Sequence, residues 1–371
     1  MKYPGFVGAS VPSRSKTINN ERTVNLYVEG SDGTPKANPS LLIRPATRSW
    51  TYCAPGPIRG FFAQDNRMFA VSGGWFYEIF QSRNVTIRGQ VTLDGKPATI
   101  SSNGPGGNQL GITSGGDIYM FDLVTNTLTA VADVDRPDPC IQMRFSDGYF
   151  IGLKGQSAQF QLSALEDGTD WNGLDVAQAS ESSDLKLAIE ISHRELWFFG
   201  SKYTEVWYNS GLASFPYQPV SGVFIEHGIA APWSVVRLDN TLYWLGQDEA
   251  GRGIVWRANG YTPERVSTNA LEHVMQQWPR LDDAQAFAFQ MDGHAWYALY
   301  SPHNDTTWLY DIGAQSWVEW AHWDEQMMRF VPWVANSHAS CWGKTFVGDR
   351  QSGMIYELDL TQYQDRIAWL T

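Results

Sequence analysis

The sequence predicts an all-β protein folded as a seven-bladed β-propeller with an extended N-terminal arm. Three features carry this prediction: a short aromatic motif that recurs, a polar turn and apolar strand before most copies, and an abundance of aromatic residues and glycine. A repeat of roughly 40 to 50 residues built from short strands is typical of a propeller. One small sheet cannot bury both of its faces alone, so the repeats must pack against one another in a closed ring.

The recurring motif reads apolar, aromatic, any residue, apolar. Its aromatic positions are Tyr77, Tyr119, Phe160, Trp207, Trp256, Tyr310 and Tyr356, which follow one another at intervals of 41 to 54 residues. Two copies are imperfect, because the third begins with Gln159 and the fourth has Asn209 at its last position. Seven copies predict seven units between about 58 and 364, with six or eight units as the alternatives.

A polar turn followed by an apolar strand precedes most copies. The turns are Asp65-Asn66, Asp147-Gly148, His193-Arg194, Asp239-Asn240 and Asp292-Gly293. Asp, Asn and Gly tolerate the positive φ of tight hairpin turns. Each unit therefore shows three antiparallel strands: one before the turn, one after it, and the aromatic strand. Residues 127–131 and 316–320 are candidates for a fourth, outer strand.

The chain divides into an arm with a ring-closing strand at 1–57, a propeller at 58–364 and a C-terminal tail at 365–371. Residues 23–28 alternate polar and apolar side chains, and we expect this strand to close the ring against a terminal blade.

Three further segments depart from the repeat. Residues 269–278 place Leu, Val, Met and Trp at helical spacing, which predicts one helix between the fifth and sixth units. Two irregular insertions, 166–184 and 210–228, are expected on one rim of the ring, where loops often carry function.

Composition narrows the functional classes. The 371 residues carry a net charge of −12, which disfavours a surface that grips nucleic acid but suits the wall of a conduit along which DNA slides. The three cysteines lie far apart, so buried reduced thiols are expected. We expect no export signal and no membrane contact, because the first 16 residues lack an apolar run and no stretch approaches about 20 apolar residues.

No residue pattern predicts catalysis, a metal or a cofactor. Residues 163–171 resemble the Asp-box turn of sialidase-type propellers, but with the aspartate out of register. The acidic loop at 133–138 lacks the Gly and terminal Glu of a calcium loop, and the seven histidines show no zinc spacing. We therefore predict no enzyme.

Six tryptophans concentrate near the C-terminus. They are Trp308, Trp317, Trp320, Trp323, Trp333 and Trp342. Such a cluster can stack on sugars or anchor a protein interface. Placement in strands favours burial between blades for most of them.

Several segments, in this order, resemble the packaged-DNA stabilisation or tail hub family of short-tailed bacteriophages. Residues 21–29 resemble the family signature R-x-x-N-x-Y-x-E. Further similar segments are 165–171, 179–184, 199–200, 205–211, 215–216, 226–230 and 260–268, and the similarity extends over most of 6–320.

This resemblance implies a structural virion protein, made in the host cytoplasm, that docks below the portal and adaptor as a six-fold ring. It would retain packaged DNA, pass it out without sequence-specific binding, and contact tail spike, fibre or needle proteins. Family members commonly continue past a point like Thr371.

We expect the arm and the two insertions to form the contacts between subunits and with the adaptor. The interface candidates are Phe6, Asn25, Tyr27, Asp167, Trp171, Phe215, Pro216, Glu226 and His227. Two alternatives stay open: a glycan-binding or glycan-cleaving propeller of a phage tail or bacterial surface system, and a cellular scaffold that recruits partners through its rim.

Overall fold

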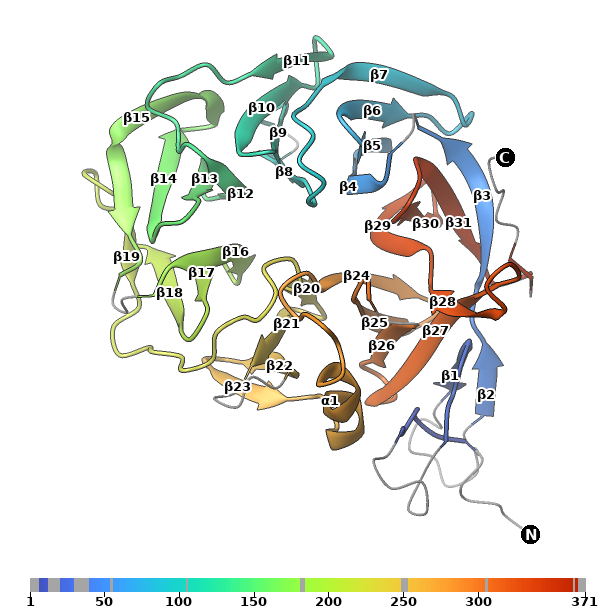
Figure 1. The fold of residues 1–371 in the computed structure, drawn as a ribbon. Coiled ribbons are helices and arrows are strands. Elements are labelled where there is room, and N and C mark those ends of the chain that lie inside the picture. Colours follow the sequence, from blue (N-terminus) through green and yellow to red (C-terminus); the bar gives the residue numbers. More distant parts are fainter. Residues whose placement is uncertain are drawn as a thin grey trace.

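A computed structural model describes residues 7–12, 21–29, 40–53, 56–104, 106–180, 184–247, 253–303, 306–362 and 364–365. Seven antiparallel sheets, each of four or five strands, stand around a central axis like the blades of a propeller (Figure 1). The seven-bladed all-β prediction is confirmed. Among the described residues, no helix is long and apolar enough to cross a bilayer.

The first three blades follow chain order from the axis outward. The first contains β4 (Ile58–Gln64), β5 (Arg67–Ser72), β6 (Trp75–Ile79) and β7 (Val85–Gln90). The second contains β8 (Thr99–Ser102), β9 (Gln109–Ser114), β10 (Asp117–Asp122) and β11 (Thr127–Ala130). The third contains β12 (Cys140–Ser146), β13 (Tyr149–Lys154), β14 (Gln159–Ala164) and β15 (Asp167–Gln178).

The next three blades repeat this order. The fourth contains β16 (Lys186–Ser192), β17 (Glu195–Gly200), β18 (Thr204–Asn209) and β19 (Tyr217–Pro219). The fifth contains β20 (Val236–Leu238), β21 (Thr241–Gln247), β22 (Gly253–Asn259) and β23 (Thr262–Arg265). The sixth contains β24 (Gln285–Met291), β25 (His294–Tyr300), β26 (Thr307–Asp311), β27 (Ser316–Asp324) and a fifth strand, β28 (Arg329–Pro332).

The seventh blade closes the ring by pairing one strand from the N-terminal part of the chain with three strands from the C-terminal part. It contains β29 (Ala335–Cys341), β30 (Lys344–Asp349), β31 (Met354–Asp359) and, as its outermost strand, β3 (Ala46–Tyr52). The prediction that 23–28 closes the ring is wrong. That segment enters β1 (Leu26–Glu29), which pairs with β2 (Ser40–Ile43) in a separate hairpin beside the sixth blade. Its alternation arises because Tyr27 faces that blade while its neighbours remain partly exposed.

The repeated turns and motifs take the places that the sequence predicts. Every aromatic motif lies on the third strand of its blade. The turn residues adopt left-handed backbone conformations, with φ of 50° and 60° at Asp65 and Asn66 and of 49° and 58° at Asp239 and Asn240. Positive φ at two successive positions is the requirement of a tight hairpin turn, which explains the Asp and Asn at these sites.

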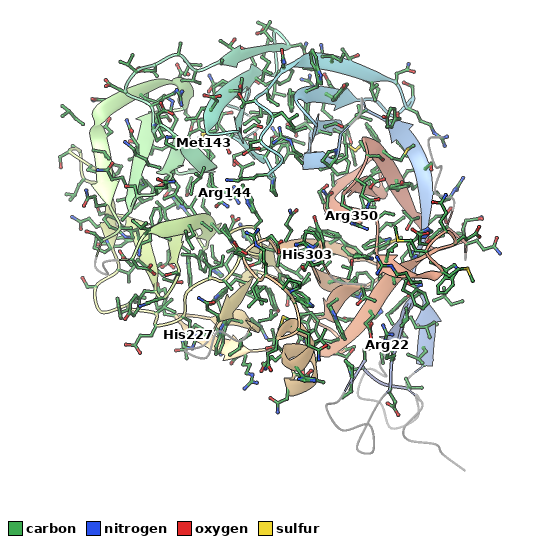
Figure 2. All side chains as sticks on the ribbon, viewed as in Figure 1. Arg22, Met143, Arg144, His227, His303 and Arg350 are labelled. Carbon is green, nitrogen blue, oxygen red and sulfur yellow. The ribbon has the colours of Figure 1, made fainter. Side chains whose placement is uncertain are left out.

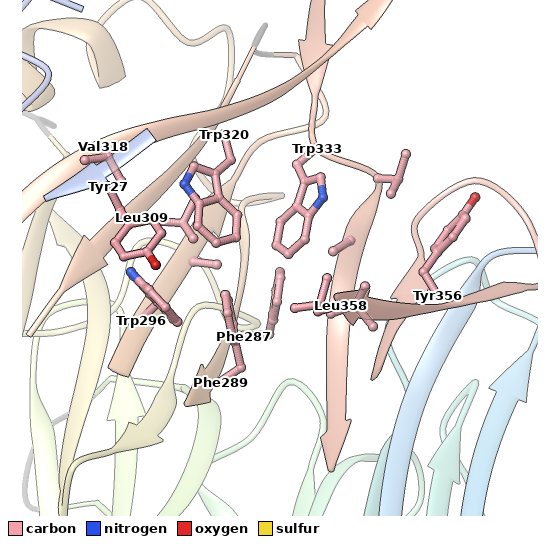
Figure 3. Close-up of a cluster of buried hydrophobic side chains, with 14 of the residues drawn as sticks. Tyr27, Phe287, Phe289, Trp296, Leu309, Val318, Trp320, Trp333, Tyr356 and Leu358 are labelled. Carbon is pink, nitrogen blue, oxygen red and sulfur yellow. The ribbon is translucent and has the colours of Figure 1, made fainter. Parts of the chain in front are cut away.

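Aromatic residues fill the space between neighbouring blades. Between the sixth and seventh blades, Trp296, Trp320 and Trp333 pack around Phe287 and Phe289 (Figure 3). The predicted burial of most of the C-terminal tryptophans is confirmed: Trp308, Trp317, Trp320 and Trp333 are at most 2% exposed, whereas Trp323 is 43% exposed. Of the six, Trp323 and the partly buried Trp342 keep solvent-exposed ring surface.

The helix and the two insertions differ in outcome. Helix α1 (Asn269–Met275) forms where predicted, with the Thr268 hydroxyl accepting a hydrogen bond from the backbone N–H of Leu271, and it ends three residues early. Most of 166–184 is not a rim loop, because β15 occupies Asp167–Gln178 as an outer strand. Residues 210–228 are irregular except for β19.

Candidate functional site

The N-terminal arm lies along the outer strand of the sixth blade. Backbone hydrogen bonds run from Ser10 N to Trp317 O (2.8 Å), from Asn25 N to Glu319 O (2.7 Å) and from Glu319 N to Thr23 O (3.0 Å). Val24 forms a parallel bridge with Glu319. The arm thus covers part of an edge whose backbone groups would otherwise face solvent.

A buried carboxylate on β27 holds the two arm segments together. Glu319 is 1% exposed, and its Oε1 accepts hydrogen bonds from Ser10 Oγ (2.7 Å) and Arg22 Nε (3.1 Å), while its Oε2 pairs with Arg22 Nη2. Ser10 Oγ also accepts from the backbone N–H of Thr23 at 2.8 Å. A buried charge is costly without such partners, so Glu319 favours the docked arm over the released one.

Asn25 fixes the turn of the arm towards β1. Its backbone is left-handed, with φ of 59°, which asparagine tolerates better than most residues. Its side-chain Oδ1 accepts hydrogen bonds from Ala321 N and from Arg44 Nε, both at 2.9 Å. Arg44 in turn forms a buried ion pair with Asp365. Asn25 therefore connects the arm to the sixth blade and, through Arg44, to the end of the described chain.

Tyr27 and Glu29 meet the sixth blade around His294. Tyr27 is 2% exposed and makes edge contacts with the rings of His294 and Trp296, with centroid distances of 4.9 and 5.6 Å. The His294 ring nitrogens face Asp311 Oδ2 at 2.6 Å and Glu29 Oε2 at 3.1 Å. Burial alone would lower the pKa of His294, but the hydrogen bonds and negative charges of Glu29 and Asp311 outweigh it, so this pKa is raised.

The four fixed positions of the R-x-x-N-x-Y-x-E motif thus share one role. Arg22, Asn25, Tyr27 and Glu29 each contact the sixth blade, through Glu319, Ala321, Trp296 and His294 respectively. Figure 2 shows Arg22 on this side of the molecule, beside the β1–β2 hairpin. The motif is a device that anchors the arm to the propeller.

Two other predicted interface residues lie on the third blade. Asp167 begins β15 and accepts hydrogen bonds from Gln109 Nε2 of the second blade (3.0 Å) and from Thr169. Trp171 is 2% exposed, and its indole N–H donates to Gly168 O at 2.9 Å. Both side chains brace the third blade from within the chain.

The remaining candidates lie on the fourth blade, except Phe6, which is outside the described residues. Phe215 is half-buried against Phe160, and Pro216 O accepts hydrogen bonds from Ser210. Glu226 is exposed, whereas His227 packs edge-on against Trp256 at 4.3 Å. Burial lowers the pKa of His227, and the nearby Glu226 charge opposes this. The structure thus separates the described candidates onto three blades, and their interface role stays a prediction.

Side chains from the innermost strands of several blades line a cavity near the axis of the propeller. Arg144 points towards the axis (Figure 2) and forms an ion pair with Glu190 at 2.9 Å. Gln142 donates to Pro232 O and accepts from Ile189 N. These side chains line a cavity of about 220 Å³.

Within the described ranges, no three His, Cys, Asp or Glu side chains gather in a way that could hold a metal ion. All three cysteines are free and buried. Burial raises the pKa of Cys53 and Cys140 to about 12, so their thiolate forms are not available at neutral pH.

The model of one protein family matches residues 24–363, from the anchored arm to beyond β31. It is described as phage stabilisation, bacteriophage P22 Gp10, β-propeller. The chain belongs to this family. The suspected resemblance is confirmed, and the chain is a phage structural protein and a component of the virion.

Solved structures similar to this family member show its fold and no more. A streptogramin B lyase has a TM-score of 0.55 at 11% identity, covering 85% of this chain and 98% of that one. Virginiamycin B lyase from Staphylococcus aureus has a TM-score of 0.54 at 10% sequence identity, and the match covers 82% of this chain and 94% of that one. The N-terminal domain of Nup159 has a TM-score of 0.52 at 8% sequence identity, and the match covers 91% of this chain and 98% of that one. A comparison with curated proteins found no match.

The sequence analysis did not identify the residues of the sixth blade that bind the arm. Glu319 and His294 are the partners of the motif on the sixth blade, and neither was singled out. One feature of the sequence pointed to Glu319: it is the only charged residue in 316–321, the first six residues of β27, and it lies between tryptophans at 317 and 320. A lone carboxylate in an apolar strand implies a buried partner. No feature of the sequence pointed to His294, because it directly follows an ordinary polar turn.

Proposed function

We propose that this chain is a tail hub subunit that docks below the portal and adaptor as a six-fold ring. It would retain the packaged genome after filling and form part of the conduit through which DNA leaves. The observation that carries the proposal is the family match over residues 24–363. The arm anchor supports it, because every fixed position of the family signature is used to hold the arm on the propeller.

We place the conduit for duplex DNA between subunits rather than through one propeller. In a single propeller, side chains such as Arg144 and Gln142 line a cavity of about 220 Å³ near the axis. A ring of several copies would enclose a wider passage. The net charge of −12 suits such a wall, because phosphates are repelled and the genome slides without being held.

The arm and the fourth-blade loop are proposed contacts between subunits and with the connector. Residues in the described segments 7–12 and 21–29 hydrogen-bond to β27, which places this part of the arm along the outer side of the sixth blade. Glu226 and the half-buried Phe215 stand on the irregular segment 210–228. Spike, fibre or needle proteins would bind the opposite end of the ring.

Electron microscopy of the purified protein, alone and with phage portal–adaptor rings, tests the proposal. We expect six-fold rings, or six-fold density that caps the adaptor. Monomeric discs without affinity for the adaptor would remove the tail hub role.

Deleting residues 1–20 separates assembly from folding. The deletion removes Ser10 but keeps the Arg22–Glu319 ion pair and all seven blades. We expect a folded propeller, with an unchanged circular dichroism spectrum, that no longer forms rings. Rings of normal size from the truncated chain would contradict an assembly role for this part of the arm.

A further inference from the structure

Charge is distributed unevenly around the propeller. Residues 58–98, which form the first blade, carry five basic and three acidic residues, a net charge of +2. Residues 133–178, which form the third blade, carry three basic and eight acidic residues, a net charge of −5. In a chain of net charge −12, the first blade is thus a basic sector and the third an acidic one.

The outer side of the third blade combines acidic with apolar exposure. We name as the acidic edge Val134, Asp135, Asp170, Leu174 and Val176. Val134 is 94% exposed, Leu174 84% and Val176 39%. Asp135 and Asp170 are exposed, and neither carboxylate makes an ion pair with another described residue. Large apolar side chains left this exposed beside unpaired charges are typical of an interaction surface.

The acidic edge is held in place by its own hydrogen bonds. The pairing of β14 with β15 shifts between Gln161–Val176 and Ser163–Trp171, so residues 172–175 bulge outward with Leu174 among them. Asn172 Oδ1 accepts from Leu174 N at 3.0 Å, and Asp133 Oδ2 accepts from Trp171 N at 3.0 Å. The bulge is therefore a formed feature of the strand, which presents Leu174 in a defined direction.

A complementary surface lies where the first and seventh blades meet. We name as the basic edge Trp50, Phe80, Arg83, Ile87 and Lys344. The cations of Arg83 and Lys344 both lie over the Trp50 ring, at 4.3 and 4.5 Å from its centroid. Lys344 pairs with Glu357, whereas exposed Arg83 has no acidic partner among the described residues. Ile87 is 56% and Phe80 38% exposed, so this edge also joins charge with apolar area.

We infer that the acidic edge of one subunit binds the basic edge of a second copy of this chain, head to tail around the ring. The inference rests on the proposed six-fold assembly and names its interface. Closed cyclic rings need two different, complementary patches on each subunit. The basic edge lies between the seventh and first blades and the acidic edge lies on the third, so two and a half blade positions separate them. At roughly 51° per blade in a seven-bladed ring, the two edges are roughly 130° apart around the axis. A ring of six needs about 120° between its two contacts.

Charge reversal on each edge tests the pairing. We expect Asp135→Lys with Asp170→Lys, and separately Arg83→Glu with Lys344→Glu, to lower the ring population at least about tenfold, because like charges would then face each other. The chain with all four substitutions should recover rings. Glu264→Lys with Glu325→Lys makes the same charge change at exposed sites on the fifth and sixth blades and should assemble normally.

The outcomes separate the interface from the function. Circular dichroism first establishes that each variant is folded. If wild-type protein forms rings and both reversed variants do too, or if the fourfold variant does not recover them, the interface is overturned and the tail hub role stands. If wild-type protein forms no ring with or without the portal–adaptor complex, the proposed function fails and the interface with it.

Cross-linking gives a second measurement that does not depend on reversed charge. The three native cysteines are buried, so a chain carrying both Arg83→Cys and Leu174→Cys has its only exposed thiols, among the described residues, on the two edges. A short bis-maleimide should then produce a ladder of oligomers. Leu174→Cys alone should produce no ladder; a ladder from this single variant, or none from the double variant, would overturn the pairing.

Discussion

The sixth and third blades share the order of their first four strands, but the fourth strand, β27 in one and β15 in the other, has opposite surroundings. On the sixth blade, β27 carries buried tryptophans and is covered by the arm through Glu319. On the third blade, β15 carries exposed Leu174 and Val176 and the exposed Asp170, whose carboxylate makes no ion pair with another described residue.

This contrast shows where a propeller can vary without losing its fold. Inner and middle strands must pack against two neighbouring blades, which restricts them to apolar residues in a fixed register. An outer strand has one free edge, which must be covered or left for a partner. On the sixth blade, the arm of the same chain covers part of this edge; on the third, no other described strand pairs with the outer edge of β15.

The largest expected effect is on the core of the sixth blade. Trp320 is fully buried and contacts Trp296, Trp333 and Phe289 with centroid distances of 4.9 to 5.8 Å. Trp320→Ala should lower the free energy of unfolding by about 3–5 kcal/mol. Leu174→Ala on the exposed third-blade edge should change it by less than about 0.5 kcal/mol. Chemical denaturation measures both, and equal effects would break the contrast between the two outer strands.

A smaller effect is expected at the arm anchor. Glu319→Gln keeps the shape of the side chain but removes the charge that holds Arg22, so arm docking should weaken by about 1–3 kcal/mol. Hydrogen exchange of residues 7–12 and 21–29 should accelerate while the inner strands stay protected. Asp170→Asn, the same change on the third blade, is the control. Unchanged protection of the arm in Glu319→Gln would show that backbone pairing alone is sufficient.

The smallest effect concerns pH. Because the pKa of His294 is raised in the folded state by Glu29 and Asp311, the stabilisation is complete below the unfolded value of about 6.5 and is lost as pH rises through the folded pKa. The melting temperature of the wild-type protein should therefore exceed that of His294→Gln by the largest amount at about pH 5.5 and by the smallest amount at about pH 8.5. A difference that grows with pH would reverse the assigned role of His294.

Periodic features were predictable from the sequence because each blade faces the same packing problem. The aromatic third strands and the Asp-Asn and Asp-Gly turns recur for that reason. The closing strand was not predictable: β3 carries no repeat motif and meets β31 only after the chain has run around the whole ring. Nor was β15, since its bulge breaks the alternation that marks a strand.

The candidate residues show the same division. The motif at 22–29 was visible as a motif, yet its partners Glu319 and His294 lie about 265 to 300 residues further along the chain and share no local pattern with it. Trp171 reads as a possible contact in the sequence, but the fold buries it.

By itself, the sequence determined the number and order of the blades, their turns and their family, because these depend on local periodicity that every repeat must satisfy. The tertiary structure alone decided which strand closes the ring, where the arm docks and which edge stays open. Those outcomes depend on contacts between distant segments, and their free energy exists only once the ring has brought the segments together.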